Sequence, residues 1–117
     1  MDFSTPFYKV RDWDLAYEIE PHIANAMQFY EAWQNDGASF RAALPEGRKV
    51  LDLAYGPAPR NVLDIFLPET APRGLVVFVH GGYWCECDKP LWSHFSEGAL
   101  RQGYAVCIPG YTLCPDI

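Results

Sequence analysis

The sequence predicts an α/β fold in which a helical N-terminal segment precedes an antiparallel hairpin and a parallel strand–helix–strand unit. Three observations carry this prediction: helical spacing of apolar residues up to Leu44, alternation from Arg48 onward, and a short apolar run over residues 75–79. The period changes near Arg48. We therefore expect an N-terminal helical segment over residues 1–47 and the beginning of a sheet over residues 48–117, together one incomplete domain.

The N-terminal segment is expected to hold one long helix and one short helix. Pro21 suits the first turn of the long helix. Side chains then recur at helical spacing, at Ile23, Met27, Tyr30 and Gln34. Asn35-Asp36-Gly37 predicts the end of this helix, because Asn and Gly adopt the left-handed backbone readily. The short helix is expected over residues 39–44.

Two strands joined by a turn are expected next. Large apolar residues fall on one face of each strand, at Leu51, Leu53 and Tyr55 and at Leu63, Ile65 and Leu67. Gly56-Pro57-Ala58-Pro59 turns the chain between them. So short a connection predicts an antiparallel hairpin.

The last part of the chain predicts a βαβ unit. Residues 75–79 are apolar without alternation, which is typical of a strand buried on both faces. Asp88 can cap a helix over residues 90–102, which Gly103 ends. The inner face of this helix is expected to carry Leu91, Phe95 and Ala99. Residues 104–108 form a second apolar strand, which should run parallel to the first.

Charge and composition exclude several classes of function. The net charge is −6 and the isoelectric point is near 4.8, and no basic cluster is present to neutralise phosphates. Binding to nucleic acid or to an anionic membrane is therefore not expected. The sequence shows no apolar run of membrane-spanning length and no secretory signal pattern, so we expect a soluble, cytoplasmic protein.

The four cysteines, Cys85, Cys87, Cys107 and Cys114, are expected to be reduced thiols, with Cys107 buried in a strand. The spacing of His80, Cys85, Cys87 and His94 lacks the paired ligands of a structural zinc site. We expect no metal and no cofactor, since no phosphate-cradling glycine loop is present either. A thiol or metal module built on Cys85 and Cys87 remains an alternative.

The segment His80-Gly81-Gly82-Tyr83-Trp84 follows the predicted strand at its carboxyl end, where open α/β sheets bind ligands. Two consecutive glycines allow backbone N–H groups to point into a cavity and stabilise an oxyanion. Taken alone, the two glycines fit a plain turn better than a site.

The wider pattern resembles the first part of the α/β-hydrolase fold, over residues 12–117. The strand ending in Asp64-Ile65-Phe66-Leu67-Pro68, the His-Gly-Gly segment, and Tyr111-Thr112-Leu113-Cys114-Pro115-Asp116 follow one another in that family's order. Tyr55-Gly56-Pro57 and the Gly-Tyr-Trp continuation look most like the arylformamidase (kynurenine formamidase) and carboxylesterase branch.

The resemblance implies roles for five residues. Gly81, Gly82 and Tyr83 would present backbone N–H groups to the oxyanion, and His80 would brace the loop rather than act as a base. Tyr83 and Trp84 would wall a substrate pocket.

The chain departs from the family pattern in its serines. The family's nucleophile lies in Gly-x-Ser-x-Gly, with its acid and histidine later in the chain. None of the four serines, Ser4, Ser39, Ser93 and Ser96, has that setting. We therefore expect about half of an enzyme, whose strand at residues 75–79 is covered by the complementary C-terminal half of the same fold or, failing that, by a second copy.

The sequence thus predicts part of a serine hydrolase for a carboxylic ester or N-formyl aryl amide, with this chain supplying the oxyanion loop. The alternative is a non-catalytic binding subunit or an inactive hydrolase relative, because the triad is not found.

Overall fold

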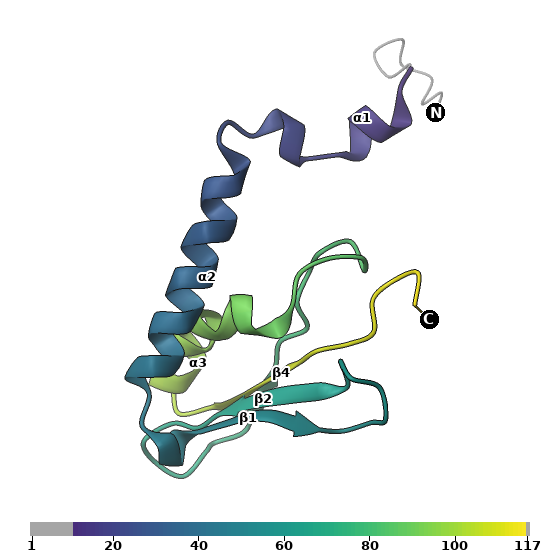
Figure 1. Ribbon diagram of the computed structural model, residues 1–117. Helices are drawn as coiled ribbons and strands as arrows, with labels where there is room; N and C mark the ends of the chain where they lie inside the picture. Colours follow the sequence, from purple (N-terminus) through teal and green to yellow (C-terminus); the bar gives the residue numbers. More distant parts are fainter. Residues whose placement is uncertain (1–10, 117) are drawn as a thin grey trace, which may run out of the picture. The chain divides into compact units, whose positions relative to one another are not determined.

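The computed structural model describes residues 11–116 (Figure 1). The chain forms two compact units, Met1–Tyr30 and Glu31–Ile117. The first unit holds α1 (Trp13–Tyr17), the 3₁₀ helix η1 (Glu20–His22) and the start of α2 (Ala26–Ala43). The second unit holds the rest of α2 and, in order, η2 (Glu46–Arg48), β1 (Lys49–Ala54), β2 (Val62–Phe66), β3 (Leu75–Val77), η3 (Lys89–Ser96), α3 (Glu97–Arg101) and β4 (Ala105–Pro109). Within residues 11–116, no helix is both long and apolar enough to cross a membrane.

In the described part of the first unit, α1 is a short capped helix. The Asp12 side chain accepts the backbone N–H of Leu15 at 3.1 Å, which satisfies a free donor at the start of α1. Pro21 lies in the first turn of η1 rather than of the long helix. Asn25 then takes a left-handed backbone, with φ of +58°, and α2 begins at the next residue. The prediction of a continuous helix from Pro21 is therefore wrong.

Helix α2 also continues where the sequence predicts an end. It runs unbroken through Asn35-Asp36-Gly37, so the separate helix expected over residues 39–44 is its last part. Gly37 serves close packing instead of termination, since a Cβ there would lie 2.4 Å from the carbonyl oxygen of Pro90. One turn later, the Arg41 guanidinium donates to the same carbonyl and, at 2.8 Å, to the hydroxyl of Ser93. Gly37 and Arg41 thus dock α2 onto η3.

The sheet has the strand order β1-β2-β4-β3. β1 and β2 pair antiparallel, which confirms the predicted hairpin. β3 and β4 pair parallel, with Val76 opposite Val106, which confirms the predicted strand–helix–strand unit. The architecture is the mixed α/β arrangement that the sequence predicts.

The connection between the parallel strands is mostly a 3₁₀ helix, not the single α-helix expected over residues 90–102. Asp88 caps it as predicted, with its carboxylate accepting the N–H of Lys89 at 2.8 Å. A 3₁₀ helix has three residues per turn, so positions three apart share a face. Ser93 and Ser96 are therefore buried, whereas Phe95, expected on the inner face, is 51% exposed.

The core lies between one face of the sheet and the helices that cover it (Figure 1). Its buried members are Phe66, Leu100, Val106 and Ile108, with Phe40, Leu44, Phe78 and Ala99 packed against them. Phe40 meets Phe66 edge to face at 5.3 Å, a geometry worth about 0.5–1.5 kcal/mol beyond burial. Cys107 is buried in β4, as expected.

β3 differs from the expectation of a strand buried on both faces. Leu75, Val76 and Val77 are all exposed, and Leu75 keeps 60% of its surface accessible. The reason is its place at the edge of the sheet, with only β4 beside it among the described residues. An apolar edge strand of this kind is a template for further strand pairing.

Candidate active site

Three segments meet at the carboxyl ends of β3 and β4. The β3–η3 loop over residues 78–88 follows one strand, and residues 110–114 follow the other. The β1–β2 turn over residues 55–61 lies at the same edge, because Leu63 of β2 pairs with Pro109 of β4. Tyr55 bridges two of the segments through its hydroxyl, which donates to the carbonyl of Gly110 at 2.6 Å.

The loop turns sharply at Gly82. Its φ is +125°, and a Cβ there would lie 2.1 Å from the carbonyl oxygen of Glu86, so only glycine fits this backbone. The Gly82 carbonyl accepts the N–H groups of Cys85 and Glu86 at 3.0 and 2.9 Å. The turn is therefore closed by its own backbone.

Tyr83 and Trp84 continue the loop in left-handed conformations, with φ of +52° and +60°. Such conformations cost a non-glycine residue of order 1–3 kcal/mol and cluster at functional sites. The two rings meet edge to face at 5.9 Å and are 73% and 68% exposed. No acceptor among residues 11–116 receives the backbone N–H groups of Gly81, Gly82 or Tyr83.

His80 is buried at the start of the loop and bonds within it. Its Nδ1 lies 2.7 Å from the Gly81 carbonyl oxygen, so Nδ1 carries the proton, since a carbonyl only accepts. The Tyr111 ring stacks on the imidazole at 4.4 Å, and its hydroxyl donates to the His80 carbonyl at 2.7 Å. Burial, followed by the nearby Cys87 thiol, raises the pKa of Tyr111, which keeps the hydroxyl protonated as a donor.

The chain was compared in sequence with protein families and with known proteins. No protein-family model matches the chain. Over 100 residues it is 34% identical to the kynurenine formamidase of Drosophila melanogaster. The aligned region covers 84% of this chain and 32% of that protein. The kynurenine formamidase of Danio rerio is 31% identical over 68 residues, or 56% of this chain and 23% of that one.

Solved structures agree in fold and in the matched region. A candidate thioesterase from Silicibacter sp. superposes with a TM-score of 0.84 at 45% identity, over 87% of this chain and 38% of that one. Esterase B from Lactobacillus rhamnosis superposes with a TM-score of 0.54 at 25% identity, over 78% and 32%. In sequence and in fold, the chain matches the first part of α/β hydrolases of the arylformamidase- and esterase-like kind. It spans between 23% and 38% of the length of these four relatives.

The predicted site residues lie together in one loop of the structure. His80, Gly81, Gly82, Tyr83 and Trp84 all lie between β3 and η3, at the predicted edge of the sheet. The Trp84 carbonyl also accepts the N–H of Cys114 at 2.8 Å, which joins the loop to the segment after β4.

The serines of the described region do not form a nucleophile site. Ser93 is buried and bonded to Arg41 and to the Pro90 carbonyl. Ser96 is also buried, and Ser39 is exposed on α2. None of these three serines hydrogen-bonds to a histidine within residues 11–116, and Ser4 lies outside the described residues. In the same range, no three His, Cys, Asp or Glu side chains are grouped as metal ligands would be.

Sequence reasoning missed an ion cluster directly after the loop, in which Lys89 and Asp64 are buried and Asp52 is exposed. The Lys89 ammonium lies 2.6 Å from Asp64 and 2.7 Å from Asp52, and the Lys89 and Asp64 side chains are 4% and 2% exposed. A bulge in β1, where Asp52 takes a φ of +57°, turns its side chain toward Lys89. Burial lowers the pKa of Lys89, but the hydrogen bonds that its ammonium donates to the Asp52 and Asp64 carboxylates, together with their negative charge, outweigh burial and leave the pKa raised.

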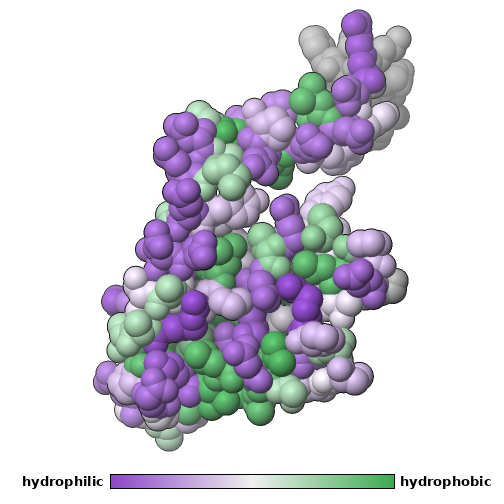
Figure 2. All heavy atoms as spheres, viewed as in Figure 1, coloured by the Kyte–Doolittle hydropathy of each residue, from purple (hydrophilic) through white to green (hydrophobic). Residues whose placement is uncertain are grey.

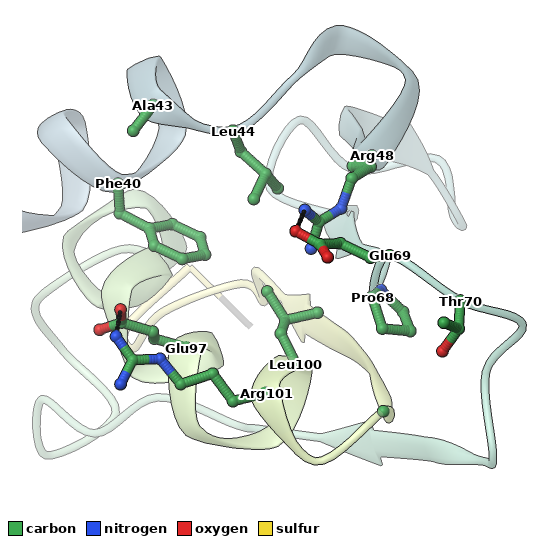
Figure 3. A pocket seen from close by; sticks show the side chains of 11 residues that line it. Phe40, Ala43, Leu44, Arg48, Pro68, Glu69, Thr70, Glu97, Leu100 and Arg101 are labelled. Atoms are coloured by element: carbon green, nitrogen blue, oxygen red, sulfur yellow. Dashed lines mark hydrogen bonds and ion pairs between the residues drawn. The ribbon is translucent and has the colours of Figure 1, made fainter.

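A separate cavity of 540 Å³ lies at the other end of the sheet (Figure 3). It opens near the start of β4, between α2 and α3, and Phe40, Leu44 and Leu100 form its apolar part. The ion pairs Arg48–Glu69 and Arg101–Glu97 lie on its rim. Figure 2 shows apolar green patches between polar purple ones over the lower part of this unit. The cavity is remote from the loop because the amino and carboxyl ends of parallel strands lie at opposite edges.

Proposed function

We propose that this chain forms the oxyanion-loop part of a serine hydrolase that cleaves a carboxylic ester or an N-formyl aryl amide. The observation that carries the proposal is a set of backbone N–H groups, at Gly81, Gly82 and Tyr83, that have no acceptor among residues 11–116 and are held in a loop at the carboxyl end of β3. The names of the relatives, a formamidase and an esterase, support this reaction class.

In the proposed mechanism, a serine hydroxyl attacks the substrate carbonyl carbon while a histidine takes its proton. The carbonyl π electrons move to oxygen, and the N–H groups of Gly82 and Tyr83 donate hydrogen bonds to the oxyanion. The intermediate then collapses, the bond to the leaving group breaks, and the histidine returns the proton to that group. Water repeats the sequence on the acyl-enzyme and releases the acid. Each donor of this kind is worth about 10²–10³ in turnover.

We propose further roles for the flanking residues. The exposed rings of Tyr83 and Trp84 wall the acyl or aryl part of the substrate, since aromatic faces bury much apolar area with little loss of side-chain freedom. His80 braces the loop through its bond to the Gly81 carbonyl and its stacking on Tyr111.

The nucleophile and its base are proposed to come from outside the residues of this chain, because Ser39, Ser93 and Ser96 have no histidine partner among the described residues and none of the four serines lies in a Gly-x-Ser-x-Gly segment. We propose that the complementary C-terminal half of the fold supplies them and adds a strand beside β3, whose apolar edge is open among the described residues. A second copy of this chain pairing along β3 is the other arrangement to be tested.

The test is fluorophosphonate labelling of the purified native protein, followed by denaturing intact-mass spectrometry and peptide mapping. The proposal predicts one adduct, on a serine other than the four in this chain. A protein that takes up no label and hydrolyses neither aryl esters nor N-formyl aryl amides would instead be a binding module.

A further inference from the structure

Arg60, in the turn between β1 and β2, contacts both other segments of the candidate site. Its Nε donates to the Tyr111 carbonyl at 2.9 Å, and its Nη2 donates to the Cys87 carbonyl at 2.8 Å. The same Nη2 lies 3.3 Å from the Asp88 carboxylate. The rigid planar fork of a guanidinium suits this bridging of two carbonyls, which the single nitrogen of a lysine cannot reproduce.

The two carbonyls that Arg60 contacts are tied to different ends of the loop over residues 78–88. Cys87 ends the loop in a left-handed conformation, with φ of +70°, just after the turn closed by Gly82. Tyr111 supports the other end, because its hydroxyl donates to the His80 carbonyl. Arg60 therefore holds one end of the loop directly and the other through Tyr111.

We infer that Arg60 is a positioning residue that fixes the backbone N–H groups of residues 81–83, an inference that rests on the proposed function. Within the described residues, no side chain other than Arg60 is seen to bond to the carbonyl of Cys87 or of Tyr111. Without the guanidinium, both carbonyls lose these partners and the loop loses its tie to the turn. A displacement of about 1 Å at such a site lowers turnover about 10²-fold.

The experiment compares Arg60→Met and Arg60→Lys in the purified native protein, with Arg101→Met as a matched control. Arg101 is an exposed arginine whose ion pair with Glu97 lies at the other end of the sheet. Turnover of an aryl ester and an N-formyl aryl amide is measured per fluorophosphonate-titrated site, together with thermal stability.

For Arg60→Met, the expected result is a fall in kcat of about 10- to 100-fold with KM changed less than about threefold, because oxyanion donors act in the transition state. Arg60→Lys should recover only part of this loss, and Arg101→Met should match the wild type. Should Arg60→Met fail to fold, Arg60→Lys provides the comparison, because a single ammonium cannot bridge both carbonyls. The inference is overturned if kcat per titrated site stays within about twofold of the wild type. A wild type that neither reacts with the probe nor turns over substrate would contradict the proposed function itself.

Discussion

Gly82→Ala is the smallest change that tests whether the loop carries the oxyanion site. The added methyl group would lie 2.1 Å from the Glu86 carbonyl oxygen, and the backbone φ of +125° is one that alanine rarely adopts. The strain alone is of order 1–3 kcal/mol. We expect the Gly82–Tyr83 peptide to rotate in response, which would remove at least one N–H from the oxyanion.

The expected magnitude follows from the loss of that donor. One oxyanion donor contributes about 2.7–4 kcal/mol, so kcat should fall about 10²–10³-fold while KM changes little. The assay is steady-state hydrolysis of an aryl ester and of an N-formyl aryl amide by the purified native protein.

Gly98→Ala is the matched control, because a Cβ at Gly98 meets nothing within 4 Å. It lies in α3, where alanine is the better helix former, so stability should be equal or greater. A Gly82→Ala protein that stays folded and keeps near-normal kcat would refute the assignment of this loop.

Three further predictions concern stability and loop support. Lys89→Met should lower the free energy of unfolding by about 3–5 kcal/mol, measured by urea denaturation, because it leaves the Asp64 carboxylate buried and unpaired. Because folding raises the pKa of Lys89, the charged ammonium contributes fully to the free energy of unfolding below about pH 10.4, and this contribution is lost as pH rises through the pKa of the folded state. The difference in unfolding free energy between the wild type and Lys89→Met should therefore shrink at high pH. A difference that stays constant would contradict the ion cluster. Tyr111→Phe should lower kcat about fivefold, the equivalent of one hydrogen bond of about 1 kcal/mol to the His80 carbonyl, and an unchanged kcat would count against that support. Gly37→Ala should lower the free energy of unfolding by about 1–3 kcal/mol, measured by thermal denaturation, because the added methyl group overlaps the Pro90 carbonyl oxygen of η3. A more stable protein would show that η3 can move away from α2 at little cost.

The spacing of apolar residues along the sequence correctly predicted the strand pairings. The antiparallel hairpin and the parallel pairing of β3 with β4 follow from patterns in neighbouring residues, and so does the place of the His80–Trp84 loop at a strand end. These features are local, or follow from the rule that strand–helix–strand units are parallel.

What the sequence did not predict depends on contacts between distant residues. Gly37 reads as a helix terminator, yet it is required by the approach of a carbonyl 53 positions later, at Pro90. The ion cluster could not be predicted because it depends on the bulge at Asp52. In a regular strand, strict alternation would point the Asp52 carboxylate away from Lys89. Arg60 in a proline-rich turn looks like an ordinary surface cation. The available signal for the cluster was Asp64, an acidic residue within the otherwise apolar strand β2, because a buried carboxylate needs a charged or hydrogen-bonding partner.

The most direct test of the central claim is a crystal structure of the native protein after reaction with a phosphonate inhibitor. The phosphonyl oxygen stands in for the oxyanion of the tetrahedral intermediate. We expect this oxygen to lie about 2.7–3.1 Å from the backbone nitrogens of Gly82 and Tyr83. A bound phosphonate whose oxygen is held by other donors, with both of these N–H groups turned away, would contradict it.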